Sequence, residues 1–315
     1  MLSVPSDYLD MEVPLPADLR RFGETTTLRI TGRTSAPAVA VLGGISGNRF
    51  VCRGEGGGSG WWPGLVGEGC AIDPELHCIL GLDFAADATG KCAPSTDDQA
   101  RVLAAALDVA GIEKLHALVG ASYGGMVGLA FASLFPGRID RIAVISAAAE
   151  PHAAGTAVRE LQRRIVALGL ENSAADEALS IARGLAMLTY RTPEELAVRF
   201  APGIGLEDPL SPSEPGRYLR ARGEAFRAVM SPQRFLSLSA SIDRHRVAAE
   251  SIACPALLIG ANSDQLVPPA QMQALAAGLG GPTSLHLRDC LYGHDMFLKE
   301  AEAMGELLKP FLVQE

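Results

Sequence analysis

The stretch LVGASYGGMVG, from Leu118 to Gly128, places one serine, Ser122, among four glycines. The run Leu115–Val119 that leads into it is apolar apart from His116, and MVGLAFASLF after it has the pattern of a helix. The serine therefore stands at a joint between a predicted strand and a predicted helix. Glycines at such a joint either allow tight packing of the chain or hold the serine hydroxyl clear of the backbone for chemistry.

The composition is typical of a soluble, folded enzyme that acts on small molecules. The chain has 315 residues, of which 48% are hydrophobic and 20% charged, so it can bury a large core as one domain or two. The formal net charge of -9 argues against general nucleic-acid binding, because no dense Lys/Arg face is available for phosphates. No apolar run approaches the ~20 residues that span a bilayer, so we expect no membrane partner.

The N-terminus and the cysteines indicate a cytoplasmic protein. The N-terminal MLSVPSDYLDMEVPLP contains acidic residues and no basic segment, which argues against a secretory signal. None of the six cysteines forms a Cys-x-x-Cys pair, so a zinc site is not expected, and in the cytoplasm they would remain thiols. Nothing in the chain indicates a metal or an organic prosthetic group.

Short apolar runs alternate with helical patterns along most of the chain. Segment 95–111 is predicted to be a helix capped by Ser95 or Thr96. Because strands that alternate with helices pair in parallel, the sequence predicts an α/β fold with a mostly parallel central sheet and helices on both faces. The predicted strands are residues 25–32, 38–44, 76–84, 115–120, 141–149, 255–262 and 283–289.

The alternation stops between about residue 150 and residue 250, where four stretches have helical patterns. This segment is too long to be a loop, so we predict a helical insertion that forms a lid. The chain then divides into a first core part at 1–150, the lid at 151–250 and a last core part at 251–315. The stretch RGEGGGSG, Arg53 to Gly60, is predicted to be a flexible loop.

The sequence Gly120-Ala121-Ser122-Tyr123-Gly124 is a G-x-S-x-G motif. Between a strand and a helix this motif is typical of the nucleophile elbow of the α/β-hydrolase fold, in which a strained turn exposes the serine hydroxyl. The helix that follows directs its N-terminal amides at developing negative charge. A serine hydroxyl is a poor nucleophile until a base removes its proton, so the motif needs partners.

The expected order of those partners along the chain is Ser, then an acid, then His. His294, in LYGHDMF, directly follows the last predicted strand and is the candidate base, whereas His286 alternates with leucines and is interpreted as a strand residue. Asp264 follows the preceding strand, in LLIGANSDQLVPP, and is the candidate acid. Ser122, Asp264 and His294 are therefore the predicted catalytic triad, although Asp264 also suits an ordinary turn and His294 an ordinary loop.

An oxyanion hole needs two backbone N–H groups near the serine. One is expected from Tyr123, the residue after the nucleophile. The other is expected from the loop LGGISGN, which follows the predicted strand at 38–44. Within that loop Ile45 is the predicted donor, although the glycines also suit a simple tight turn.

Several longer motifs accompany the triad. They are GWWPGLVGEGCAID (Gly60 to Asp73), GASYGGM (Gly120 to Met126), ELQRRIV (Glu160 to Val166), ARGLAMLTYRTPEELAVRF (Ala182 to Phe200), YLRARGEAF (Tyr218 to Phe226), IGANSDQLVPP and YGHDMFL. Over most of the chain these motifs resemble the homoserine O-acyltransferases of the α/β-hydrolase superfamily. The GWW and LAMLTYRTPEE segments are the most specific parts of the resemblance, because generic esterases lack them.

The resemblance implies a ping-pong acyl transfer. Ser122 would take an acyl group from acyl-CoA, a co-substrate, with His294 as base and Asp264 orienting it, and would pass the group to L-homoserine in methionine biosynthesis. Asp295 matches the family position that pairs with the substrate amino group, and Arg163 matches the arginine that holds its carboxylate. Arg163 also suits a solvated helix face, and Asp295 a surface charge. The resemblance further implies a homodimer built through the lid helices.

The acyl donor and the acceptor stay open at this point. Tyr123 stands where most relatives carry methionine, and the segment Asp83–Thr96 is shorter than in many relatives. Family members use acetyl-CoA or succinyl-CoA, and some accept L-serine in place of L-homoserine. A succinyl tail should need a nearby cation, for which Arg49 and Arg53 are candidates because they are close in sequence to the oxyanion loop.

Two other functions are compatible with the same features. An esterase or thioesterase would use Ser122, Asp264 and His294 with water as the acceptor, and a non-enzymatic binding protein would keep only the scaffold. Water would not need Arg163 and Asp295, and an intact triad in the expected order argues against the binding protein.

Overall fold

The computed structural model describes residues 8–54, 58–200 and 211–313, which form a central sheet of eight strands. The strands are Tyr8–Pro14 (β1), Thr25–Thr31 (β2), Ala38–Leu42 (β3), Cys78–Leu82 (β4), Ala117–Ala121 (β5), Ile142–Ile145 (β6), Ala256–Ala261 (β7) and Thr283–Arg288 (β8). Their order across the sheet is β1-β2-β4-β3-β5-β6-β7-β8. Strands β3 to β8 pair in parallel, whereas β2 pairs antiparallel with both β1 and β4.

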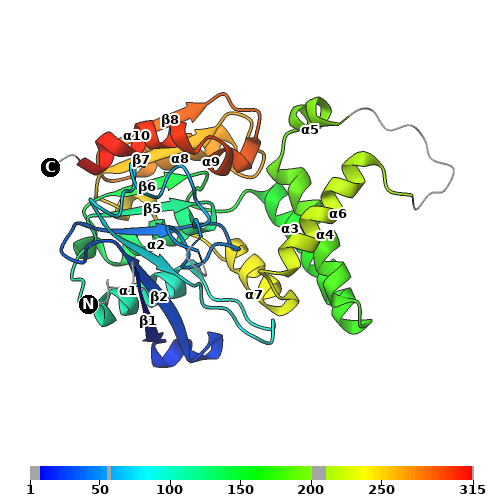
Figure 1. Cartoon of the computed structure of the whole chain (residues 1–315), viewed down its shortest axis with the longest axis horizontal. Coiled ribbons are helices and arrows are strands. Elements are labelled where there is room, and N and C mark those ends of the chain that lie inside the picture. Colours follow the sequence, from blue (N-terminus) through cyan, green and yellow to red (C-terminus); the bar gives the residue numbers. More distant parts are fainter. Residues whose placement is uncertain (1–7, 55–57, 201–210, 314–315) are drawn as a thin grey trace, which may run out of the picture.

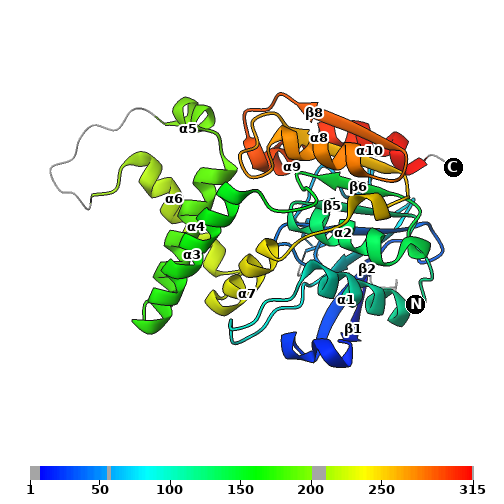
Figure 2. The same cartoon turned by 180° about the vertical axis from the view of Figure 1, so that it is seen from behind.

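Helices cover both faces of the sheet, which confirms the predicted α/β architecture (Figures 1 and 2). The covering helices are Thr96–Val109 (α1), Tyr123–Leu134 (α2), Pro269–Gly278 (α8), Met296–Lys299 (α9) and Ala301–Val313 (α10). Successive side chains of a strand point to opposite faces, so Leu258 belongs to one core and its neighbours Leu257 and Ile259 to the other. The first core includes residues of α1, α2 and α8, and the second includes residues of α9 and α10.

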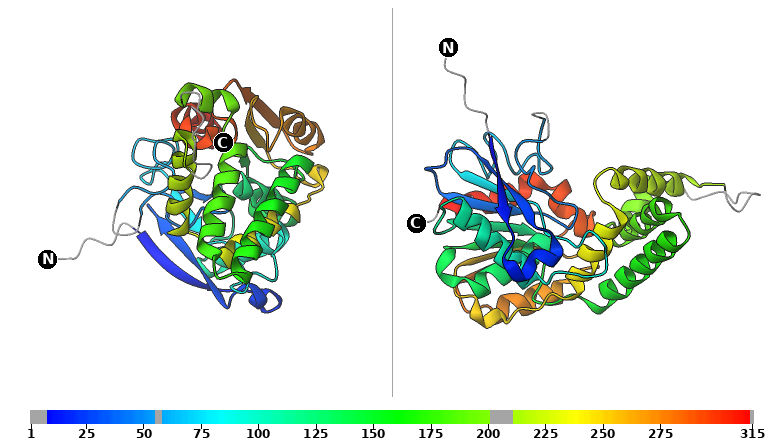
Figure 3. Two further views of the ribbon diagram at one scale, coloured as in Figure 1. Left: turned by 90° about the vertical axis from the view of Figure 1, so that its right-hand side faces the viewer. Right: turned by 90° about the horizontal axis from the view of Figure 1, so that it is seen from below.

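The described residues between β6 and β7 form five α-helices, which stand beside the sheet (Figures 1 and 3). They are Ala153–Glu171 (α3), Ala175–Tyr190 (α4), Pro193–Arg199 (α5), Glu214–Arg227 (α6) and Pro232–Asp243 (α7). The sequence predicts the first four but not α7, because the serines of SLSAS are poor helix formers. That helix forms because Phe235 and Leu238 pack into the core. The division of the chain at residues 150 and 250 stays a prediction.

The sequence also does not predict β1. Only Val13 of this edge strand is buried, so the strand lacks the apolar alternation of a half-buried one. Two predictions fall partly outside the described residues. They concern the N-terminal segment, of which residues 1–7 are not described, and the predicted flexible loop, of which residues 55–57 are not described. In the part of the chain that the structure describes, no helix is long and apolar enough to cross a membrane. Short 3-10 helices lie at Ala17–Phe22 (η1), Pro136–Arg138 (η3), Ala249–Ser251 (η4) and Gly293–Asp295 (η5).

Candidate active site

Ser122 occupies a strained turn between β5 and α2. Its backbone angles, a φ of 54° and a ψ of −121°, lie in a region that residues other than glycine rarely adopt. The flanking glycines permit this turn through close contacts. A Cβ on Gly120 would lie 2.4 Å from the carbonyl oxygen of Gly124, and one on Gly124 would lie 2.3 Å from that of Leu42. The glycines therefore let β3, the turn and α2 approach closely enough to place the serine at the edge of the sheet.

Two further side chains complete a hydrogen-bonded chain with Ser122. The Nε2 atom of His294 lies 2.9 Å from Ser122 Oγ, and its Nδ1 atom lies 2.8 Å from Asp264 Oδ2. His294 stands on η5, just after β8, and Asp264 follows β7, so both come from the same edge of the sheet as Ser122. The other carboxylate oxygen of Asp264 accepts hydrogen bonds from the amides of Leu266 and Val267. These bonds fix the carboxylate, which in turn fixes the imidazole.

The environment of His294 raises its pKa above the ordinary value of 6.5. Burial alone would lower the pKa, because it disfavours the charged imidazolium. The negative charge and the hydrogen bond of Asp264 outweigh that effect, and the charge of Asp295 adds to them. The positive charge of Arg159 acts in the opposite direction. A more basic imidazole is better able to accept the proton of Ser122.

The loop after β3 turns tightly beside the serine. The amide of Gly124 donates to the carbonyl of Gly43 at 2.8 Å, and that of Gly47 to the carbonyl of Gly44 at 2.7 Å. Ile45 lies inside this turn, and Tyr123 is the first residue of α2, where helix amides lack intrahelical acceptors. Within the described residues neither of these two amides donates a backbone hydrogen bond. Both are therefore available to an oxygen atom next to Ser122.

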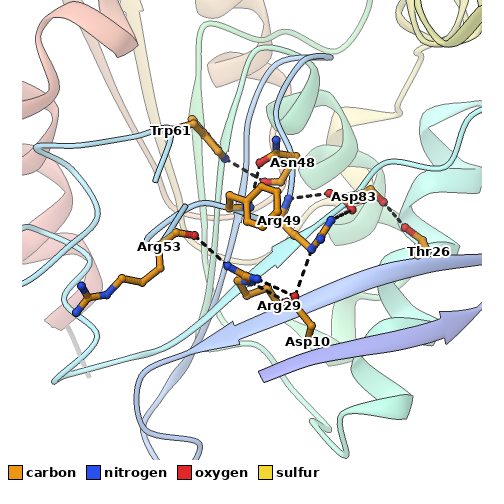
Figure 4. A network of polar contacts seen from close by, with 9 residues as sticks. Asp10, Thr26, Arg29, Asn48, Arg49, Arg53, Trp61 and Asp83 are labelled. Carbon is orange, nitrogen blue, oxygen red and sulfur yellow. Dashed lines mark hydrogen bonds and ion pairs between the residues drawn. The ribbon is translucent and has the colours of Figure 1, made fainter. Parts of the chain in front are cut away.

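A network of ion pairs anchors this loop to the antiparallel end of the sheet (Figure 4). Arg49 donates to Asp83 through both its backbone amide, at 2.9 Å, and its Nη1, at 2.6 Å. Its Nε lies 3.6 Å from Asp10 of β1, which also accepts two hydrogen bonds from Arg29 of β2. Trp61 of the GWW motif donates to the carbonyl of Asn48, and its ring lies against Gly43. The β1 strand and the GWW motif thus help to position the glycine-rich loop.

Two cavities meet at Ser122 and His294, and both are bordered by Tyr190 and Ile242. The first, called the α3 cavity, has about 580 Å³ of empty space, and its lining includes Ser146, Gly155, Arg159, Gln162 and Val267. The second, called the loop cavity, has about 760 Å³ of empty space, and its lining includes Gly44, Ile45, Trp61, Arg183, Asp295 and Phe297. A reacting group at Ser122 can therefore be approached from two sides.

Two guanidinium groups beside the α3 cavity share one carboxylate. Arg159 and Arg163, one turn apart on α3, each place a nitrogen 2.6 Å from an oxygen of Asp243 on α7. The three side chains are only 13%, 21% and 12% exposed, so the cluster keeps an excess positive charge with little water around it. Of the two arginines, Arg159 lines the cavity.

Arg183 and Asp295 bring one positive and one negative group to the loop cavity. Arg183 of α4 stacks over the rings of Tyr190 and Phe226, at 5.1 Å and 4.8 Å from their centroids. Among the described residues it forms no ion pair with a carboxylate. Asp295, next to the triad histidine, is mostly buried and lies 2.8 Å from Nε of Arg191.

The LTYRTPEE segment of the lid docks on the loop that carries His294. The Tyr190 ring lies 5.7 Å from the imidazole between centroids, and Thr192 donates to the carbonyl of Leu291 at 2.6 Å. Arg191 bridges Asp295 and Glu195 with nitrogen–oxygen distances of 2.8 Å and 3.1 Å. This segment therefore holds the triad histidine in place and forms part of both cavities.

The comparison with known proteins agrees with this geometry. A family model described as the alpha/beta hydrolase fold matches residues 31–301. A homoserine O-succinyltransferase from Xanthomonas campestris is 40% identical over 89% of this chain and 76% of its own length. The chain belongs to the homoserine O-acyltransferase family. A homoserine O-acetyltransferase from Thermus thermophilus, a further relative, is 31% identical over 81% of this chain and 73% of its own length.

Solved structures share the fold of this homoserine O-acyltransferase family member. The homoserine O-acetyltransferase from Bacillus anthracis aligns with a TM-score of 0.82 at 14% identity, over 98% of each chain. Esterase E22 aligns with a TM-score of 0.84 at 20% identity, over 97% of this chain and 99% of its own. At such low identity these likenesses show the fold alone. The same scaffold is found in transferases and esterases, so the difference between them must lie in the cavities.

The structure brings together most of the residues that the sequence singles out in this family member. Ser122, Asp264 and His294 form one hydrogen-bonded chain. Ile45 and Asp295 line the loop cavity. Tyr123 is a lining residue of the α3 cavity, but its hydroxyl is bound to the buried Ser241 at 2.6 Å, and burial raises the pKa of that hydroxyl to about 12. That hydroxyl is therefore already committed to the core.

Three arginines are placed differently from the expectation. Arg163 lines neither cavity, because its Nη1 binds Asp243 at 2.6 Å and Ser239 at 3.2 Å. Arg49 and Arg53, the candidate cations for a succinyl tail, also line neither of the two cavities. Arg49 is held in the network of Figure 4, and Arg53 reaches Glu68 at 3.5 Å.

The sequence does not predict several residues that line the cavities. They are Ser146, which follows β6, and the lid residues Arg159, Gln162, Arg183, Tyr190 and Ile242. A signal existed for Arg159, because it stands one turn before Arg163 on the same helix. No signal existed for Ser146, since a serine after a buried strand looks like any loop residue. In the part of the chain that the structure describes, no group of His, Cys, Asp or Glu could hold a metal ion.

Proposed function

We propose that this protein transfers an acetyl or succinyl group from acyl-CoA to the hydroxyl of L-homoserine, as a step of methionine biosynthesis. The observation that carries the proposal is that Arg183 and Asp295 line the same cavity, beside Ser122 and His294. An amino acid carries a carboxylate and an ammonium group, and one guanidinium and one carboxylate facing the same cavity suit that pair of charges. Water as an acceptor needs neither.

In the first half of the proposed reaction, Ser122 becomes acylated. Its Oγ attacks the thioester carbonyl while Nε2 of His294 takes the hydroxyl proton, and Asp264 stabilises the imidazolium. The amides of Ile45 and Tyr123 donate to the developing oxyanion. The carbon–sulfur bond then breaks, and the thiolate of CoA leaves with the proton from His294. The product of this half is an ester on Ser122.

In the second half, the amino acid enters the loop cavity. Asp295 binds its ammonium group, and Arg183 binds its carboxylate, a role that the sequence assigns to Arg163. The hydroxyl of the amino acid gives its proton to His294 and attacks the acyl-serine carbonyl. The ester bond to Ser122 then breaks, His294 returns the proton to Oγ of Ser122, and the O-acyl product leaves. L-Serine is one methylene shorter than L-homoserine, a difference that a pocket distinguishes by about 1–3 kcal/mol. The relatives of 40% and 31% identity are named for homoserine, so we place L-homoserine first and L-serine second.

The test is an assay of acyl transfer with purified protein. Acetyl-CoA or succinyl-CoA is supplied with L-homoserine, with L-serine or with no amino acid, and both thiol release and the acylated product are followed. We expect rapid thiol release only when an amino acid is present, with one O-acyl product formed for each thiol. Equal thiol release without an amino acid, with free acid as the product, would instead establish an esterase or thioesterase.

We further propose a homodimer that forms through the lid. Leu161 and Leu168 are exposed on α3, seven residues apart and therefore on one face, and Ile181 and Leu188 repeat the pattern on α4. The two helices pack against each other, so these side chains form one apolar surface. Size measurement of the wild type and of a Leu161→Glu/Leu168→Glu variant tests the assembly. The free thiols of all six cysteines fit the reducing cytoplasm as the location.

A further inference from the structure

We propose that the α3 cavity binds a second carboxylate at the far end of the acyl group, and that Arg159, Ser146 and Gln162 select that donor. The donor would then be the CoA thioester of a dicarboxylic acid such as succinate, rather than of acetate. This inference rests on the proposed acyl transfer by Ser122 and adds the identity of the group transferred.

Two buried polar side chains of the α3 cavity have no partner. Ser146 follows β6 and is fully buried, at 0% exposure, and its Oγ makes no hydrogen bond within the described residues. The side chain of Gln162, on α3, is 4% exposed and likewise forms no hydrogen bond in the part of the chain that the structure describes. Buried polar groups in folded proteins are nearly always bonded, since an unbonded one is costly. A hydroxyl and an amide that face one cavity therefore indicate a polar ligand.

The charge around the cavity indicates that this ligand is an anion. Asp243 neutralises only one of the two guanidinium groups that bind it, so one positive charge is left over. Arg159 uses Nε and Nη2 for Asp243, and its Nη1 lies over Gly155, another residue of the cavity lining. The guanidinium thus presents an edge to the cavity while its other edge is held in place. A carboxylate can accept from that edge, from Ser146 and from Gln162 together.

An acetyl group would leave these polar atoms unsatisfied. Its methyl carbon cannot accept a hydrogen bond, and it would occupy a small part of the cavity next to a guanidinium. A site built to bind a polar group discriminates strongly against an analogue that lacks that group, because its own buried donors then stay unpaired. The α3 cavity therefore favours a donor whose acyl chain ends in a carboxylate.

The amino acid is less well suited to this cavity than to the loop cavity. The α3 cavity does contain a carboxylate, that of Glu150, but this side chain is more than half exposed and pairs with Arg246 at 2.8 Å. Asp295, which is buried and close to His294, lies in the loop cavity instead. With the acceptor in the loop cavity, the α3 cavity is left for the part of the acyl group beyond its carbonyl carbon.

The test compares two donors in variants of the whole protein. The ratio of kcat/KM for succinyl-CoA to that for acetyl-CoA is measured with L-homoserine as the acceptor. We expect the wild type to prefer succinyl-CoA, and Arg159→Met to lower the ratio about 10- to 100-fold by removing one charged hydrogen-bond donor. The methionine keeps the aliphatic stem, and Asp243 retains Arg163 as its partner, so the fold should tolerate the change.

Arg163→Met is the matched control. It removes the same amount of charge from the same carboxylate, but this guanidinium does not line the cavity and Arg159 keeps the edge that faces it, so the donor ratio should fall much less than in Arg159→Met. Any effect on the amino acid cancels in that ratio. Gln162→Leu is a second test variant, because leucine has nearly the same volume as glutamine and the ion pairs of Asp243 stay intact. This variant should also lower the donor ratio. The rate with acetyl-CoA shows in each variant whether the triad is still assembled.

Three results would overturn the inference. One is a wild type that uses acetyl-CoA as well as or better than succinyl-CoA, which would leave the acyltransferase function standing. Another is an unchanged ratio in both Arg159→Met and Gln162→Leu. The third is a raised KM for L-homoserine in Arg159→Met with the ratio unchanged, which would make the α3 cavity the amino-acid site. If neither donor is used with any amino acid, the proposed function itself fails, and the inference fails with it.

Discussion

The two cavities that meet at Ser122 differ in the charged groups around them. Beside the α3 cavity, two guanidinium groups of one helix share the single carboxylate of Asp243. Beside the loop cavity, the carboxylates of Asp295 and Glu195 share the guanidinium of Arg191, and Arg183 brings a second guanidinium to the cavity itself. An excess positive charge attracts a carboxylate, whereas groups of both signs suit an amino acid, which carries both a carboxylate and an ammonium group.

This difference indicates that the side chains that recognise the substrates and the groups that carry out acyl transfer come from different parts of the molecule. Ser122 and His294 follow strands of the sheet and border both cavities at their junction, while Ile45 and Tyr123, whose amides are the proposed oxyanion donors, border one cavity each. The charged groups that distinguish the cavities come mainly from the lid helices α3, α4 and α7 and from the loop after β8. Substitutions at the junction should therefore affect both half-reactions, whereas substitutions in one cavity should affect one substrate.

The largest effect is expected at the junction itself. Ser122→Ala removes the nucleophile, so kcat should fall about 10⁵- to 10⁶-fold with either donor and at every pH. Steady-state thiol release measures the loss. Ser133→Ala, which changes an exposed serine of the same helix α2, is the control and should behave like the wild type. Activity of Ser122→Ala near that of the control would remove Ser122 from the mechanism.

The next largest effect is expected for Asp264→Asn. The amide keeps the shape of the side chain but cannot stabilise the imidazolium, so kcat should fall about 10³- to 10⁴-fold. The pH dependence gives a second reading. The charge of Asp264 raises the pKa of His294, and the reaction needs neutral histidine, so the wild-type rate should fall as pH drops below a value above 6.5. In Asp264→Asn this acidic limb should move to lower pH. An unmoved limb would show that another group controls it.

A smaller and more selective effect is expected in the loop cavity. Arg183→Met and Asp295→Asn should each raise the KM for L-homoserine about 10- to 100-fold, because each removes one charged hydrogen bond. The KM for the acyl donor should change little. Initial rates at varied amino-acid concentration measure both constants. Arg163→Met should have a smaller effect on the amino-acid KM, and a larger effect there than in Arg183→Met would restore Arg163 as the carboxylate ligand.

The smallest effect is expected for Tyr123→Phe. The Tyr123 hydroxyl forms a hydrogen bond with the buried Ser241. Its loss should therefore reduce the free energy of unfolding by about 1 kcal/mol. The donor ratio should be unchanged, because the hydroxyl that is lost binds Ser241 in the core. Denaturant unfolding and the two-donor assay check this. A changed donor ratio would mean that the hydroxyl contacts the acyl tail directly.

The chemistry of the site could be predicted from sequence because each triad residue follows a buried strand. Parallel strands end at one edge of a sheet, so chain order alone places Ser122, Asp264 and His294 near one another. One glycine of the G-x-S-x-G motif has a local cause, since a Cβ on Gly120 would meet Gly124 and Gly125 of the same turn, whereas a Cβ on Gly124 would meet Leu42 of the neighbouring strand β3. Apolar runs and motifs are therefore enough to predict both the sheet and the positions of the three triad residues.

The residues that recognise substrates could not be predicted in the same way. Arg159 and Arg163 have the same sequence environment, and only the packing of α3 against α7 determines that the first lines a cavity. Arg183 belongs to a motif that also has a structural role, because the segment after it docks on the loop that carries His294. The motif alone therefore does not show that Arg183 lines a cavity. Ser146 is unusual because its φ is 50° and because no described residue binds its hydroxyl. Such facts depend on how helices from distant parts of the chain meet.

The central claim, that an acyl group rests on Ser122 until an amino acid takes it, can be tested by the mass of the intact protein. The protein is mixed with succinyl-CoA alone, and then a portion receives L-homoserine. We predict that each chain gains one succinyl group, that peptide mapping places it on Ser122, and that L-homoserine removes it far faster than water does. A protein that never gains the group, or that loses it equally fast without L-homoserine, would contradict the account.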